Sequence, residues 1–154
     1  MIESYKALGV GSLKEVARRC AVRLCAGCTV ALTGDLGSGK TTFCREVIRK
    51  LSKDSFLGSP TYGLIHEYSC SGFTLYHVDL YRVESLREVQ DLGLFEVLEE
   101  NLVLIEWPKL IEEVINFDVR VSLKASGRDA ATKRDVIIEW KNGLCNVRIE
   151  AHSG

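Results

Sequence analysis

The sequence has no surplus of positive charge. Its 20 Lys and Arg stand against 21 Asp and Glu, which gives a formal net charge of −1. A protein that holds nucleic acid by itself usually carries a basic excess, so we expect no DNA partner. Hydrophobic residues make up 46% and charged residues 27% of the chain, which excludes an intrinsically disordered or fibrous protein.

The sequence also lacks a long apolar segment. Runs without charge, such as residues 24–34, are short and punctuated by Gly and Thr, whereas a membrane-spanning helix needs about 20 apolar residues. The N-terminus has no basic region followed by an apolar stretch, which a secretory signal requires. We therefore expect a cytoplasmic protein with no membrane contact, whose six cysteines are reduced thiols.

No repeat, low-complexity tract or linker interrupts the chain, and we predict one domain over residues 1–154. At this length folding buries roughly 70% of the unfolded chain's surface, so the core needs no metal or disulfide. The first helix is expected from Ser12 to Gly27, because Ser12 and Glu15 have the spacing of a capping box. Further helices are expected over residues 41–51, 84–99 (broken at Gly93) and 110–115. Strands are expected over residues 29–33, 63–68, 73–79, 102–106, 119–123, 136–140 and 145–149.

The order of these elements predicts the fold class. Strands alternate with helices through the first two thirds of the chain, which favours an α/β sheet with helices on both faces. The strand of residues 102–106 is a continuous apolar run, typical of a strand covered on both sides. Short turns, including Asn-Gly at 142–143, add antiparallel hairpins to a mostly parallel sheet.

The clearest motif is the segment 34–41 (GDLGSGKT), which matches G-x-x-x-x-G-K-[ST] between an expected strand and an expected helix. Its glycines let successive N–H groups point at phosphate oxygens, and the helix N-terminus adds positive potential. Lys40 can reach the β- and γ-phosphates, and the Thr41 hydroxyl can coordinate Mg²⁺. We predict a P-loop NTPase-like domain whose nucleotide-binding residues are Asp35, Leu36, Gly37, Ser38, Gly39, Lys40, Thr41 and Thr42.

Two acidic residues end expected strands and are candidates to complete this site. Ligands of open α/β sheets bind at the carboxyl ends of the strands, where Asp79 and Glu106 are expected. Glu106 follows the most buried-looking strand and is the better candidate for a Walker-B type metal acid. Asp79 could bind the metal through water or sense the γ-phosphate. The alternative for either residue is a strand-end carboxylate that faces solvent.

Five segments together resemble the TsaE (YjeE) family, small bacterial ATPases of tRNA threonylcarbamoyladenosine synthesis. They stand in the order and at the spacing of that family and cover about residues 10–120. The segments are 34–42 (GDLGSGKTT), 59–62 (SPTY), 77–82 (HVDLYR), 92–94 (LGL) and 105–108 (IEWP).

The resemblance implies a role for several residues. It assigns ATP to the loop, Mg²⁺ to Thr41 and Glu106, and a catalytic requirement to Lys40, Asp79 and Glu106. Residues 59–62, with Thr61, resemble a first switch segment, the residues after Asp79 resemble a second, and Trp107 matches a tryptophan beside the site. Ser38 stands where the family commonly has Ala, and Ser12 matches only approximately a Thr near the nucleotide.

The resemblance also implies partners. It predicts a factor that docks on the TsaD–TsaB pair and whose weak ATP hydrolysis supports transfer of threonylcarbamoyl to adenosine 37 of tRNA. The net charge agrees with tRNA being contacted mainly through those partners. One rival is a small-molecule kinase, although no Arg-rich lid stands out beyond Arg82 and Arg87. Another is a non-hydrolysing nucleotide-gated module or a GTPase-like switch, although the guanine-reading N-K-x-D motif is absent.

The remaining cysteines and histidines carry weaker signals. Cys20, Cys25 and Cys28 have the spacing C-x₄-C-x₂-C, which resembles that of iron–sulfur ligands. We favour buried free thiols, because Cys20 lies on the apolar stripe of the first helix and no suitable fourth cysteine is near. His66 and His77 lie on expected strands, where packed or surface histidines are commoner than ligands.

Overall fold

The computed structural model describes residues 1–62 and 64–141, which form a sheet in the strand order β1-β7-β6-β2-β5-β4-β3. The strands are β1 (Ile2–Leu8), β2 (Thr29–Thr33), β3 (Ile65–Cys70), β4 (Phe73–Asp79), β5 (Leu102–Glu106), β6 (Val119–Ala125) and β7 (Arg134–Trp140). The helices are α1 (Val10–Ala21), α2 (Lys40–Leu51), α3 (Leu86–Asp91) and α4 (Leu94–Val97), with the 3-10 helices η1 (Pro108–Ile111) and η2 (Gly127–Asp129). None of the helices described has the length and apolar character needed to cross a membrane.

The four strands in the middle of the sheet, β6, β2, β5 and β4, run parallel. Antiparallel pairs flank them, with β3 beside β4 and with β7 and β1 beyond β6. The predicted α/β fold is confirmed, and every residue of β5 is buried as expected. Glu106 at the end of β5 lies opposite Leu32 of β2 on one side and Asp79 of β4 on the other, so the loop after β2 meets both acids at one edge.

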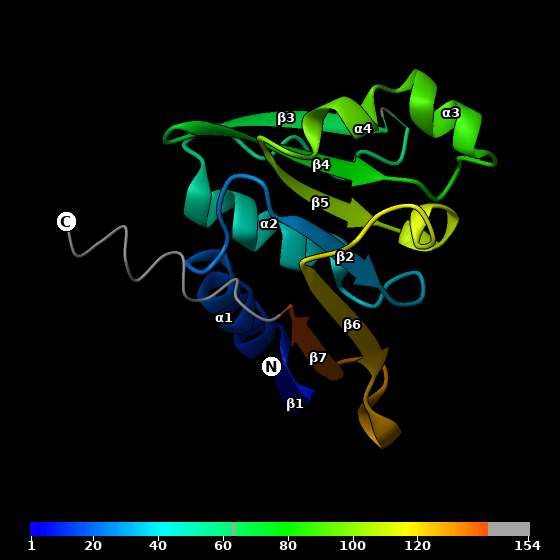
Figure 1. The fold of residues 1–154 in the computed structure, drawn as a ribbon. Helices are drawn as coiled ribbons and strands as arrows, with labels where there is room; N and C mark the ends of the chain where they lie inside the picture. Colours follow the sequence, from blue (N-terminus) through cyan, green and yellow to red (C-terminus); the bar gives the residue numbers. More distant parts are fainter. Residues whose placement is uncertain (63, 142–154) are drawn as a thin grey trace.

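Helices cover both faces of the sheet (Figure 1): α1 and α2 pack on one face, and α3, α4 and η1 on the other. The alternation of side chains along each strand decides which layer a residue joins. In β2, Val30 and Leu32 pack with α1 and α2, while Ala31 between them packs with the other layer. The same alternation turns His77 of β4 and Glu106 of β5 toward α2.

The edge strand β1 was not expected from the sequence. Its residues do not alternate cleanly, because the pairing with β7 shifts register between Tyr5 and Leu8. Ala7 has φ +52° within this bulge, and its N–H donates to the Asp135 carboxylate at 2.8 Å. A pattern search based on a period of two misses a strand with such an interruption.

The first helix differs from its prediction at both ends. It begins at Val10 rather than at Ser12, and it ends at Ala21 rather than at Gly27. No side chain caps its N-terminus, so the predicted capping box is wrong. Glu15, the second member of that box, instead pairs with Arg18 at 3.3 Å within the helix.

Later elements differ less from the prediction. The expected break at Gly93 is confirmed, and this glycine separates α3 from α4 at φ +77°. The helix predicted over residues 110–115 is instead η1, which starts two residues earlier because Pro108 fits the first helical position. The hairpin turn and strand predicted over residues 142–149 lie outside the described residues.

We predict that Leu104→Ala lowers the free energy of unfolding by about 2–5 kcal/mol, because Leu104 is 1% exposed and packs between β5 and the α1–α2 layer. Urea unfolding followed by circular dichroism measures the loss. Leu57→Ala is the matched control, since Leu57 is 62% exposed and should change stability by no more than about 0.5 kcal/mol. Equal losses in the two variants would contradict this assignment of the core.

Candidate functional site

The loop of residues 34–39 joins the end of β2 to the start of α2. Gly34 has no room for a side chain, because a Cβ there would lie 2.4 Å from Ser38 Oγ and 2.6 Å from Leu123 O. Gly39 precedes α2 with φ +105°, a conformation that glycine adopts without strain. The loop therefore leads directly into a helix N-terminus, whose first N–H groups have no helical acceptor and can bind an anion.

Lys40 is 4% exposed, and its ammonium group is held inside the loop. Nζ donates to Gly34 O at 2.5 Å and lies 4.0 Å from the centre of the Trp107 ring. Burial lowers the pKa of Lys40, while the charges of Glu106 and Asp79 act in the opposite direction. The site thus places a cation over an aromatic ring and within electrostatic range of two carboxylates.

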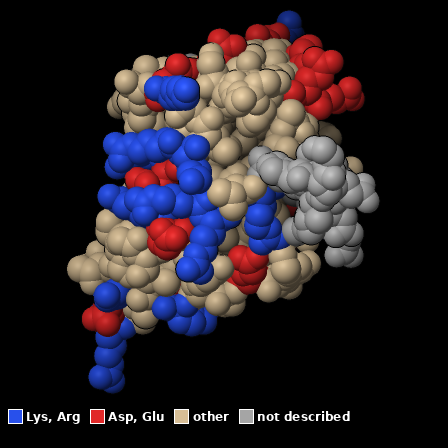
Figure 2. Space-filling view, turned by 90° about the vertical axis from the view of Figure 1, so that its left-hand side faces the viewer, with Lys and Arg blue, Asp and Glu red and all other residues tan. Residues whose placement is uncertain are grey.

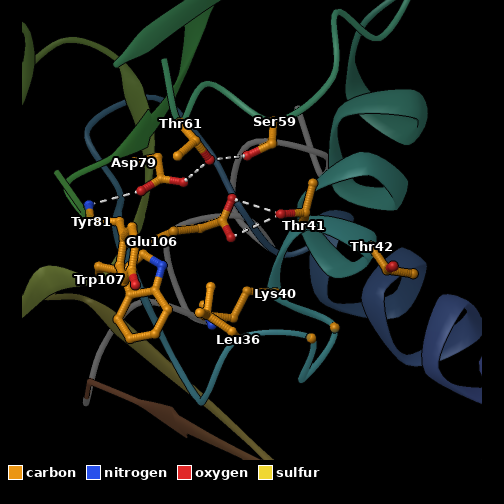
Figure 3. A pocket seen from close by; sticks show the side chains of 12 residues that line it. Leu36, Lys40, Thr41, Thr42, Ser59, Thr61, Asp79, Tyr81, Glu106 and Trp107 are labelled. Carbon is orange, nitrogen blue, oxygen red and sulfur yellow. Dashed lines mark hydrogen bonds between the residues drawn. The ribbon is translucent and has the colours of Figure 1, made fainter. Parts of the chain in front are cut away.

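Glu106 is the central acceptor of the site (Figure 3). Thr41 Oγ1 donates to its carboxylate, 3.0 Å from Oε1 and 3.3 Å from Oε2. His77 Nε2 lies 2.7 Å from Oε2, and its ring stacks on Phe56 with centroids 6.2 Å apart. Both Glu106 and His77 are buried, so these two contacts fix the orientation of the carboxylate.

Asp79 connects the loop before β3, which contains Thr61, to the loop after β4, which contains Tyr81. Its Oδ2 accepts from Thr61 Oγ1 at 2.8 Å, and its Oδ1 accepts from Tyr81 N at 2.9 Å. Ser59 Oγ lies 2.8 Å from Thr61 Oγ1 and extends the network along the first loop (Figure 3). One carboxylate therefore contacts both segments for which the family resemblance predicts a switch role.

Trp107 has an unusual backbone conformation, with φ +58° and ψ +58°. A non-glycine residue in this region is strained, and such strain persists where the surrounding structure holds it. Here Pro108 starts η1 immediately afterwards, and the Trp107 ring packs 4.9 Å from Tyr81 and over Lys40. The turn thus directs the indole into the site instead of along β5.

A cleft of about 270 Å³ opens at the carboxyl edge of the sheet. Of the residues predicted for the site, the cleft brings together Leu36, Gly37, Gly39, Lys40, Thr41, Thr42, Thr61, Asp79, Glu106 and Trp107. Asp35 and Ser38, also predicted, lie on the other side of the loop, beside β6 and Arg134. Ser59 and Tyr81 line the cleft as well.

Arg134, at the start of β7, clasps the loop from outside. Its Nη2 donates to Gly37 O at 2.9 Å and its Nε to Ser38 O at 3.1 Å. Arg134 also lines a second hollow of about 270 Å³, which shares Gly37, Gly39 and Thr42 with the cleft. The apolar wall of this hollow consists of Leu8, Val10 and Leu13.

Sequence reasoning missed His77 and Arg134 as residues of the site. His77 precedes Asp79 by two on β4, so strand alternation alone places both side chains on the face toward α2. Arg134 is 96 residues from Ser38, and no local signal links it to the loop. Its contact depends on the position of β7 beside β6, which only the tertiary structure establishes.

The C-x₄-C-x₂-C segment behaves as packed thiols. Cys20 and Cys28 are 2% exposed, and Cys25 Sγ lies 3.4 Å from Cys28 Sγ. Burial raises the pKa of Cys20 and of Cys28 to about 12. Among the residues that the structure describes, these thiols do not belong to a group of three donors placed to hold one metal ion. The arrangement favours our interpretation over an iron–sulfur cluster.

The donors of the cleft suit Mg²⁺ beside a nucleotide phosphate. Thr41 and Glu106 offer a hydroxyl and a carboxylate, and Mg²⁺ prefers such oxygen ligands. Their oxygens lie 3.0 Å apart, close enough to bind one ion together. The glycine loop, too tight at Gly34 for a Cβ, suits the close approach of phosphate to backbone N–H groups.

The fold and the loop define a P-loop NTPase-like, nucleotide-binding protein. Comparison with protein families makes the assignment specific. The family described as "Threonylcarbamoyl adenosine biosynthesis protein TsaE" matches residues 10–136. The chain belongs to this TsaE family.

Individual relatives agree with the assignment. The chain is 44% identical to the tRNA threonylcarbamoyladenosine biosynthesis protein TsaE of Rickettsia bellii. The match extends over 139 residues, which are 89% of this chain and 88% of the relative. The chain is 44% identical over 103 residues to the protein of the same name from Rickettsia conorii, covering 66% of this chain but only 59% of that relative's length. The crystal structure of Bacillus subtilis YdiB superposes with a TM-score of 0.73 at 25% identity and covers 99% of this chain and 95% of that one.

We predict that Gly34→Ala weakens binding of a fluorescent ADP analogue at least tenfold, because the new Cβ collides with Ser38 and with the backbone of Leu123. Fluorescence titration measures the affinity. Gly11→Ala in α1 is the matched control, since a Cβ there meets nothing within 4 Å. An affinity for Gly34→Ala equal to that of Gly11→Ala would show that the analogue does not bind this loop.

Proposed function

We propose that this chain is one P-loop ATPase domain that binds and slowly hydrolyses ATP in the cytoplasm. In this proposal it acts as a factor on the TsaD–TsaB complex and is required for N6-threonylcarbamoyladenosine at position 37 of tRNA. The proposal depends on one observation: the glycine loop lines the same cleft as Thr41, Asp79 and Glu106. The TsaE family match supports the tRNA pathway.

The two hollows on either side of the loop suit the two ends of a nucleotide. The cleft holds Lys40 and the acidic residues and suits the β- and γ-phosphates. The second hollow combines the apolar side chains of Leu8, Val10 and Leu13 with the guanidinium of Arg134, which suits a flat base. The glycines common to both hollows would lie along the phosphate chain.

Thr41 and Glu106 are the residues that would hold Mg²⁺. When bound, the ion neutralises phosphate charge as it develops during hydrolysis. Lys40 stabilises the same charge from inside the loop, where burial strengthens its effect. His77 keeps the Glu106 carboxylate turned toward Thr41 through the 2.7 Å contact.

Asp79 would couple hydrolysis to the surface of the protein. Its carboxylate binds both Thr61 and the N–H of Tyr81, so a change at the γ-phosphate reaches two loops at once. Tyr81 contacts Trp107, which in turn covers Lys40. The network gives the partner proteins a surface that depends on the bound nucleotide.

The distribution of charge supports contact with tRNA through the partners. Figure 2 shows Lys and Arg side chains gathered on one face, with acidic side chains between them. The last turns of α1 and α2 carry four cations, Arg18, Arg19, Arg49 and Lys50. Glu46 pairs with Arg18 at 3.0 Å and with Arg49 at 3.4 Å. Cations that are already paired contribute less to phosphate binding than free ones.

We predict that Lys40→Ala lowers ATP hydrolysis at least 100-fold without unfolding the protein, because it removes the cation that stabilises phosphate charge. Phosphate release from Mg-ATP measures the rate, and circular dichroism checks the fold. Lys53→Ala, which removes an exposed lysine, is the control and should retain the wild-type rate. Wild-type turnover in folded Lys40→Ala protein would remove this loop from the mechanism.

We also predict slow phosphate release by the purified chain alone and a faster rate after TsaD and TsaB from the same organism are added. Turnover that does not change, with no complex on gel filtration, would contradict the role as a factor for that complex. Transfer of phosphate to a metabolite instead of water would indicate a kinase. Equal binding of GTP and ATP would indicate a nucleotide-gated switch.

A further inference from the structure

A second group of metal-binding side chains lies directly beneath the cleft. Cys44 of α2, His77 of β4 and Glu106 of β5 bring a thiol, an imidazole and a carboxylate within 4.8 Å of one another. Cys44 and His77 are fully buried, and Glu106 is 2% exposed. Three separate elements thus converge on one point, which is how metal sites are built in folded proteins.

The chemistry of this group differs from that of the Mg²⁺ site. Sulfur and nitrogen donors select a thiophilic cation such as Zn²⁺, whereas Mg²⁺ takes oxygen ligands. Zinc bonds of about 2.0–2.3 Å in a tetrahedral arrangement separate neighbouring donors by about 3.3–3.6 Å. The donors here lie within 4.8 Å, so side-chain movements of about 1 Å suffice to surround an ion.

The imidazole of His77 already faces one of the other two donors. Its Nε2 lies 2.7 Å from Glu106 Oε2, so Nε2 is the nitrogen that a cation shared with Glu106 would take. Nδ1, on the other side of the ring, has no hydrogen-bond partner among the residues that the structure describes and takes no part in this group. A cation that replaces the contact between Nε2 and Glu106 keeps both side chains close to their present positions.

We propose that Cys44, His77 and Glu106 form an inhibitory site for a thiophilic divalent cation. The cation enters through the cleft, because Glu106 lines that cleft while the other two donors lie behind it. Burial raises the pKa of the Cys44 thiol, so the cation has to displace its proton, which leaves to solvent as the metal–sulfur bond forms. The inhibition, but not the binding, rests on the proposed ATPase function.

Inhibition follows because Glu106 belongs to both sites. Its carboxylate now accepts from Thr41 Oγ1 and faces the position proposed for Mg²⁺. Once a thiophilic cation binds it from the side of Cys44, the carboxylate has less negative charge to offer Mg²⁺, and the two cations repel each other, so the Mg²⁺ site is weakened. Cys44 is the residue that distinguishes the two sites, since it plays no part in the proposed hydrolysis.

Titration with Co²⁺ as a spectroscopic probe tests the binding. We expect a cobalt–thiolate charge-transfer band in the wild-type protein and its loss in both Cys44→Ala and Cys44→Ser. Two variants are used so that the test still stands if one of them fails to fold. Cys70→Ala is the matched control, because it removes a partly exposed thiol elsewhere and should keep the band. A band that persists in folded Cys44 variants, or no band in the wild type, overturns the site.

Hydrolysis of Mg-ATP with added Zn²⁺ tests the consequence. We expect EDTA-reversible inhibition of the wild type and of Cys70→Ala, and at least tenfold weaker inhibition of the Cys44 variants. Equal inhibition of all proteins overturns the inhibitory role. A Cys44-dependent cobalt band in a protein that hydrolyses no ATP supports the metal site while it contradicts the proposed ATPase.

Discussion

The site depends on the parallel register that places β5 between β2 and β4. That register sets Glu106 opposite Leu32 on one side and opposite Asp79 on the other. Because β2 continues into the glycine loop, the loop and both acids must meet at one edge of the sheet. A shift of one residue in β5 would turn Glu106 to the opposite face, away from Thr41. The buried apolar side chains of β5 prevent such a shift, so the packing of the core also fixes the position of Glu106 in the site.

The charged groups of the cleft are compatible with burial because each has partners. Lys40 bonds to carbonyls of its own loop and lies over Trp107, and Glu106 accepts from Thr41 and contacts His77. Removal of one member leaves another charge buried without compensation, which destabilises a protein more than the pair stabilises it. The side chains therefore hold their positions in advance and need little rearrangement to receive phosphate.

The sequence was sufficient to predict the parts of the fold that local pattern determines. The apolar run of β5 and the loop before α2 have signals within a few residues, and strand ends located Asp79 and Glu106. The prediction failed where the structure departs from simple periods, as at the bulge of β1 around Ala7. It also missed Arg134, because that contact joins residues 96 positions apart. His77 lies between these cases, since strand alternation placed it correctly but gave no reason to prefer it over a packed histidine.

The hydrogen bonds from Arg134 to the loop affect when the loop completes its folding during synthesis. Its hydrogen bonds to the carbonyls of Gly37 and Ser38 come from β7, which is synthesised long after the loop itself. During translation the early strands and α1 and α2 leave the ribosome first. The loop of a nascent chain thus lacks its outer clasp until β7 has been made and has docked beside β6. The loop therefore reaches its final set of contacts only after almost all of the described chain has been made.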